Sequence, residues 1–89
     1  MLSLQEINAL MSRLNEWSLE DGAIVKSFGF ANFKDGLEFV NKVGEVAEKM
    51  NHHPDIVLSY NWVRVSLTTH SERGLTGKDF EAAEEIDKI

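Results

Sequence analysis

The fold is decided by residues 48–70, which read EKMNHHPDIVLSYNWVRVSLTTH. All three histidines of the chain lie in this stretch, and its single proline, Pro54, follows directly on the first two. Proline lacks an N–H and pushes the residue before it towards extended geometry, so it ends a helix that arrives from the N-terminal side. After Pro54, runs rich in Ile, Val, Tyr and Trp indicate two strands at residues 56–60 and 62–69. The stretch predicts a helix end followed by a β-hairpin.

A long helix is predicted immediately upstream. Asn32 can cap its N-terminus, because a short polar side chain there accepts a bond from a free backbone N–H. Apolar residues then recur at steps of three and four, which predicts one buried face over residues 33–50. The apolar residues of this stripe are Phe33, Leu37, Val40, Val43, Ala47 and Met50.

The N-terminal third reads as one helix and a second hairpin. Ser3-Leu4-Gln5-Glu6 has the form of a helix capping box, and helical apolar spacing continues over residues 3–15. Asp21-Gly22 is a strong two-residue turn signal between alternating segments at 17–20 and 23–30. These residues therefore predict a helix followed by two antiparallel strands.

A last helix begins after Thr76, with Asp79 at the third helical position as the acid of a capping box. The predicted order is α-β-β-α-β-β-α in a single α+β domain, residues 1–89. We expect a four-stranded antiparallel sheet with the helices packed on one face.

Size and composition limit the function classes. A chain of 89 residues builds one modest core, so a small-molecule site would be a surface cleft or be completed by a second subunit. A net charge of −6, with scattered basic residues, argues against nucleic acid as a direct ligand. No apolar run approaches the length of a membrane helix. Without cysteine or an N-terminal secretory pattern, we expect a cytoplasmic protein without disulfides or thiolate chemistry.

Three interpretations of the histidines compete. They are surface residues of a turn, ligands of a metal site, or acid–base groups acting on a small substrate. If the strands after Pro54 pair, His70 returns to the edge where His52 and His53 lie. Consecutive side chains of an extended segment point to opposite sides, which makes His52-His53 a poor chelate. We therefore favour acid–base chemistry without a metal, with Glu48 able to orient one imidazole.

The pattern resembles the signature of the pterin-4a-carbinolamine dehydratase family. The matching residues are Glu48-Lys49-x-x-His52-His53-Pro54, then Tyr60-Asn61-x-Val63-x-Val65-x-Leu67-x-Thr69-His70, then Gly74-Leu75-Thr76-x-x-Asp79. The region around Trp17 and Phe28-x-Phe30-x-x-Phe33 is similar to the less specific N-terminal half. The resemblance covers nearly the whole chain.

This resemblance implies a hydro-lyase that dehydrates 4a-hydroxytetrahydropterin to quinonoid dihydropterin and water, in support of tetrahydrobiopterin recycling. It implies no metal and no other cofactor, and a homodimer or homotetramer. The catalytic residues carried over are His52, His53 and His70. The residues implied to support catalysis or to contact substrate are Glu48, Pro54, Thr69, Ser71, Glu72, Asp79 and Trp17.

Two alternatives remain beside this hypothesis. One is a non-catalytic dimerisation or interaction module on the same scaffold, as some animal members of the family assist a homeodomain transcription factor. The other is a small metal-binding protein. The sequence alone also leaves open which histidine is the acid, and Trp17 and Asp79 have simple structural roles as a core aromatic and a capping acid.

Overall fold

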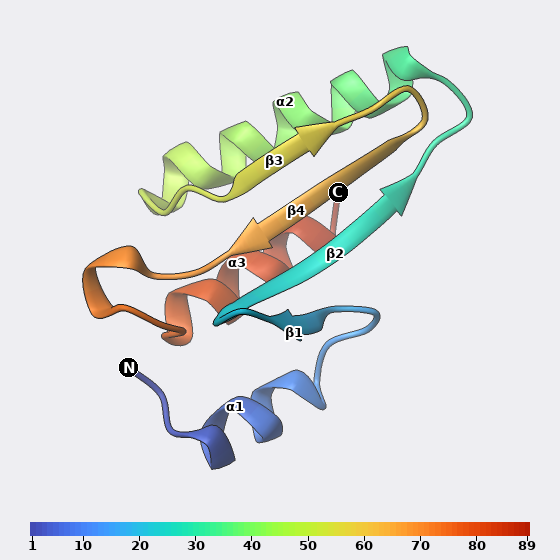
Figure 1. Ribbon diagram of the computed structural model, residues 1–89. Coiled ribbons are helices and arrows are strands. Elements are labelled where there is room, and N and C mark those ends of the chain that lie inside the picture. The colour runs from blue at the N-terminus through green and yellow to red at the C-terminus, as the bar shows by residue number, and fades with distance from the viewer.

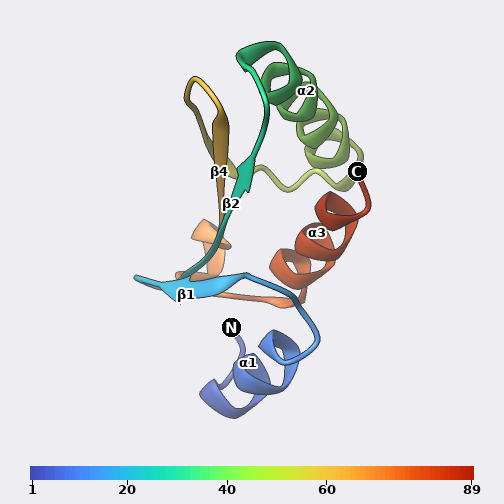
Figure 2. The same ribbon diagram turned by 90° about the vertical axis from the view of Figure 1, so that its right-hand side faces the viewer.

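The computed structural model describes residues 1–89 and has the predicted element order (Figure 1). The elements are α1 (Leu4–Met11), β1 (Ser18–Glu20), β2 (Ala23–Gly29), α2 (Phe33–Met50), β3 (Asp55–Leu58), β4 (Trp62–Leu67), the 3₁₀ turn η1 (His70–Glu72) and α3 (Gly77–Asp87). All strand pairs are antiparallel, in the order β1-β2-β4-β3. In Figure 2, α2 and α3 lie together against one face of the sheet, and α1 lies beyond β1. The predicted fold class is confirmed.

The core lies between this face and the helices. Val63, Val65 and Leu67 of β4 are fully buried and alternate with half-buried or exposed residues, as period-two burial of a one-sided sheet requires. The register places Ile24 of β2 opposite Leu67, and α2 contributes Val43 to the same cluster. The pair β2–β4 therefore forms the centre of the sheet, and β3 pairs with β4 at one edge.

The helix caps follow the sequence closely. Ser3 and Glu6 form the predicted capping box of α1, and the side chain of Asn32 accepts a bond from the backbone N–H of Asp35 in α2. The hydrogen bond from the backbone of Ser3 lowers the pKa of Glu6. Asn51 ends α2 in the left-handed conformation at φ 51°, which reverses the chain towards His52.

Two details of the sequence prediction are wrong. Helix α1 ends at Met11 rather than near residue 15, because the N–H groups of Arg13 and Leu14 bond carbonyls three residues back and tighten the last turn. The second wrong detail concerns α2: Phe33 and Leu37 were predicted on its buried face, but they are 44% and 42% exposed.

The first half of α2 faces the sheet through other residues. Gly36 and Phe39 are buried there in place of Phe33 and Leu37. A Cβ on Gly36 would lie 3.2 Å from Cδ1 of Leu58, so glycine lets the helix approach β3 closely. This close approach sets which apolar residues of the helix become core.

None of the three helices has the length and apolar character that crossing a membrane requires. The cytoplasmic location stays a prediction.

Candidate active site

A fully buried carboxylate, Asp79, connects three parts of the chain that converge at the N-terminus of α3. Its Oδ2 accepts hydrogen bonds from the hydroxyl of Thr69 (2.8 Å) and from the backbone N–H of Thr76 (3.0 Å). Its Oδ1 lies 2.6 Å from Nε2 of His52. A buried carboxylate is costly without such partners, and here three donors are aimed at it.

The hydrogen bonds around Asp79 have one consistent direction. Because an ionised carboxylate only accepts, Thr69 must donate to it, and Thr69 Oγ1 is then free to accept from the hydroxyl of Thr76 at 2.8 Å. Thr76 Oγ1 in turn accepts from the backbone N–H of Lys78 at 3.3 Å. The predicted capping box of Thr76 and Asp79 is present, and the same acid also contacts His52. Asp79 thus caps α3 and contacts His52, and its role in catalysis stays a prediction.

His52 is held in one tautomer by this carboxylate. With Oδ1 of Asp79 as the acceptor, the proton lies on Nε2, which leaves Nδ1 for a substrate. The side chain of His52 is 10% exposed, so its ring is confined but reachable from solvent. A buried acid that orients an imidazole is a common arrangement for proton transfer.

His53 points elsewhere, as expected for consecutive residues of an extended segment. Its Nε2 lies 2.5 Å from Oε2 of Glu48, in the last turn of α2. Both side chains are exposed, at 57% and 78%, so this pair contributes little to stability. Glu48 therefore orients His53 and not His52, and Pro54 lies half-buried between His53 and β3.

His70 follows directly on buried Thr69 and begins the exposed turn η1. A hollow of about 420 Å³ lies beside this turn, at the N-terminus of α3. The side chains that line it belong to Thr69, Ser71, Glu72, Thr76, Lys78 and Glu81. Asp79 thus contacts both His52 and Thr69, and Ser71 and Glu72 line the same hollow as Thr69.

Trp17 is not part of this cluster. It is buried in the core, and its indole N–H donates to Oδ2 of Asp87 at 2.9 Å, while the ammonium of Lys26 donates to Oδ1 at 2.8 Å. Asp87 ends α3 and Asp79 lies in its first turn, so the two carboxylates are separated by about 12 Å along the helix axis. The position of Trp17 matches its structural role as a core aromatic.

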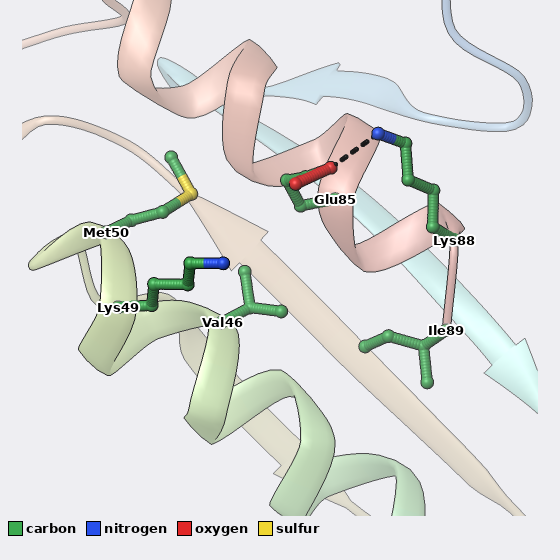
Figure 3. A pocket seen from close by; sticks show the side chains of 6 residues that line it. All are labelled: Val46, Lys49, Met50, Glu85, Lys88 and Ile89. Atoms are coloured by element: carbon green, nitrogen blue, oxygen red, sulfur yellow. Dashed lines mark ion pairs between the residues drawn. The ribbon is translucent and has the colours of Figure 1, made fainter.

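A second hollow of about 430 Å³ lies between α2 and α3 and contains none of the predicted site residues (Figure 3). Val46, Met50 and Ile89 form its apolar walls, and an ion pair between Lys88 and Glu85 spans 2.7 Å at its rim. The hydrogen bond from Lys88 lowers the pKa of Glu85. We place the candidate site at His52 and Asp79 because these two side chains are in contact.

Lys78 and Glu81 line the hollow beside Thr69 but were not predicted from the sequence, and Thr76 was predicted as a helix cap. The available signal was the capping box itself, because its acid, Asp79, is a predicted site residue, and this puts the first turn of the helix beside that site. The arrangement of the His, Asp and Glu side chains also bears on the hypothesis that the histidines bind a metal ion. No group of three or more His, Asp or Glu side chains is arranged to hold a metal ion.

Comparison with known proteins identifies the family. The sequence profile described as pterin 4 alpha carbinolamine dehydratase matches residues 1–89. Relatives that carry the provisional name pterin-4-alpha-carbinolamine dehydratase include one from Sulfolobus acidocaldarius, 44% identical over 99% of this chain and 97% of its own length. Another, from Picosynechococcus, is 50% identical over 94% of this chain and 91% of its own length.

Solved structures show the same architecture. A transcriptional coactivator/pterin dehydratase from Brucella melitensis superposes with a TM-score of 0.93 at 36% identity, covering 98% of this chain and 95% of that one. A pterin dehydratase-like protein described as a RuBisCO assembly factor in the α-carboxysome matches with a TM-score of 0.66 over 81% and 83% of the two chains. At 16% identity, the second likeness concerns the fold alone. Because the family profile matches the chain over its full length and these relatives are similar to it throughout, the chain belongs to the pterin 4 alpha carbinolamine dehydratase family.

Proposed function

We propose that this protein dehydrates 4a-hydroxytetrahydropterin to quinonoid dihydropterin and water, by acid–base catalysis on its histidines and in support of tetrahydrobiopterin recycling. The observation that carries the proposal is the part-buried contact between His52 and Asp79 in a chain of this family. The contact presents one oriented imidazole with a free ring nitrogen, which is what transfer of a single proton needs.

The reaction requires two proton movements. The C4a–O bond breaks, and because hydroxide is a poor leaving group, an acid must protonate that oxygen so that it departs as water. A base removes the proton from ring nitrogen N5 as the C4a–N5 double bond forms. Each well-placed acid or base contributes typically about 10²–10⁴-fold in rate.

His52 is our candidate for the acid. The positive charge on a doubly protonated His52 is offset by the carboxylate of Asp79 at 2.6 Å, and Nδ1 is the nitrogen that delivers the proton. His70 is the partner that takes the N5 proton. His53, oriented by Glu48, binds the pterin or serves as a second proton-transfer group.

The test is a spectroscopic dehydratase assay with the carbinolamine, run with and without a chelator such as EDTA. We expect turnover well above the uncatalysed rate and equal rates in both samples, because the protein's own imidazoles move the protons. Activity that falls in chelator and returns with added metal would instead support the metal-binding interpretation. A chain that leaves the uncatalysed rate unchanged would contradict the proposed dehydration.

An interaction role is the second candidate, and exposed apolar residues favour it. Edge strand β3 exposes Val57 (51%), and the turn after it exposes Tyr60 (70%). The exposed Phe33 and Leu37 form a second apolar area on α2. One solved protein of this fold is described as an assembly factor. These surfaces support the proposal that the chain forms a homodimer or homotetramer.

Size-exclusion chromatography with light scattering measures the mass of the protein in solution and so tests this proposal. We expect the mass of two or four chains at micromolar concentration and a shift towards one chain in Val57→Lys, since a charge on an edge strand opposes pairing. Glu84→Lys, an exposed change on α3, is the control and should keep the larger mass. A single-chain mass in the unmodified protein would contradict the oligomer.

A further inference from the structure

The hollow between α2 and α3 leaves apolar side chains open to solvent, and no histidine lines it (Figure 3). Val46 and Met50 of α2 are half-buried in its wall, and Ile89, which follows α3, is 44% exposed and points back towards α2. The volume of about 430 Å³ lies within the range of roughly 300–1,000 Å³ that is usual for small-molecule sites. Because these three side chains are aliphatic, the hollow suits an aliphatic group of a small ligand.

The charged groups of this hollow include one ammonium without a partner. Lys88 and Glu85 form an ion pair of 2.7 Å, and the pKa of Glu85 is lowered first by this hydrogen bond and then by the nearby charge of Lys49. Lys49 itself forms no ion pair. Its side chain points from α2 towards α3, over the hollow (Figure 3). An anionic group of a ligand can therefore pair with Lys49 beside the apolar wall.

A smaller hollow of about 260 Å³ adjoins the first one, since Met50 and Glu85 line both. Its other lining side chains are Glu81 and Glu84, and neither of them forms an ion pair. The pKa of Lys88 is raised by Glu85 and, to a lesser degree, by Glu84, so Glu84 lies beside the charges of the first hollow. A cationic group of a ligand that lies on Met50 can therefore pair with Glu84.

We propose that the two adjoining hollows bind a free α-amino acid with an aliphatic side chain. Its carboxylate pairs with Lys49 and its ammonium with Glu84, while its side chain packs on the apolar wall that Val46, Met50 and Ile89 form. A ligand with only a negative charge is repelled by the carboxylates of the smaller hollow, and one with only a positive charge is repelled by Lys49. A zwitterion with an apolar body matches both sets of charges and the wall between them.

Titration of the protein with three matched ligands, followed by NMR of the backbone amides, tests this site. Leucine carries both charges, 4-methylpentanoate is leucine without its ammonium, and 3-methylbutylamine is leucine without its carboxylate. At low ionic strength we expect leucine to bind with a Kd of about 1 mM, as suits a small ligand in an open hollow, and each of the other two to bind about threefold or more weakly. The amide shifts that leucine causes should lie within residues 45–50 and 81–89, which contain both hollows.

Variants of exposed side chains assign the two charges of the ligand. Lys49→Ala should weaken leucine about threefold or more and leave 3-methylbutylamine, which has no carboxylate, bound no more weakly than before. Glu84→Ala should weaken leucine in the same way and leave 4-methylpentanoate bound no more weakly. Lys34→Ala and Glu45→Ala remove the same charges elsewhere on α2, outside both hollows, and should keep the affinity for leucine.

The outcomes separate this site from the proposed active site. The affinity for leucine should persist in His52→Gln, because no residue that lines either hollow contacts His52 or Asp79 through a hydrogen bond. Leucine shifts that do not saturate, or that centre on the histidines, overturn the inference. Equal binding of leucine and either singly charged ligand overturns the recognition of a zwitterion. None of these results depends on whether the protein dehydrates a pterin.

Discussion

Replacing His52 by glutamine should lower kcat for dehydration by about 10²–10⁴-fold while the protein stays folded. The amide of glutamine can still donate to Oδ1 of Asp79, which His52 contacts at 2.6 Å in the native chain, so the buried carboxylate keeps a partner. An amide cannot deliver a proton, however, and the step that expels water loses its acid. The measurement is kcat from the dehydratase assay, beside the melting temperature of the variant.

Glu45→Gln serves as the matched control for His52→Gln. It is an exposed change on α2, outside the residues that contact Asp79 or line the hollow, and it should leave kcat unchanged. A folded His52→Gln protein with undiminished turnover would show that another group is the acid. Of the remaining imidazoles, His70 would then be the first candidate.

Replacing Asp79 by alanine should cost about 3 kcal/mol or more of unfolding free energy and most of the activity. The change leaves the hydroxyl of Thr69, the backbone N–H of Thr76 and Nε2 of His52 without their acceptor. A hydrogen bond to a charged group contributes about 1.5–3 kcal/mol, and losses within one network do not simply add. Denaturant unfolding measures the free energy, and the dehydratase assay measures the activity.

Asp79→Asn separates the structural role of this residue from its role in orienting His52. Asparagine can keep an oxygen towards Thr69 and Thr76, so we expect most of the stability to return. Its amide nitrogen then faces His52 and forces the ring proton from Nε2 to Nδ1, which removes the acid–base function in the same way as a wrong tautomer does in other enzymes. Nitrogen NMR of the imidazole reports the tautomer. An Asn variant with native activity would show that Asp79 acts only as a helix cap.

Much of the site could be predicted because its residues lie close in sequence to strong local signals. Pro54 marks the extended segment that splits His52 from His53, and the antiparallel hairpin brings the end of β4 back towards that segment. The capping box of Thr76 and Asp79 marks the start of α3. Each of these signals depends only on residues close together in the chain, so the sequence alone predicts these local features.

The partners of the side chains were harder to predict. The pairing of Glu48 with His53 depends on how the left-handed Asn51 turns the chain at the end of α2. The burial of Gly36 and Phe39 depends on how closely the helix approaches β3. These contacts depend on how neighbouring elements are rotated relative to one another, and no local sequence pattern predicts that rotation.

The sequence by itself determined the order of the elements, their caps and turns, the sheet face that is buried and the family. These follow from periodicity, from backbone limits at Pro54 and Asp21-Gly22, and from residue types at fixed spacing. Only the tertiary structure decided that Asp79 binds His52, that Trp17 donates a hydrogen bond to Asp87 at the other end of α3, and that a polar hollow opens beside Thr69. These depend on three-dimensional packing, because a hydrogen bond forms between groups that the fold brings within about 3 Å, whatever their separation in sequence.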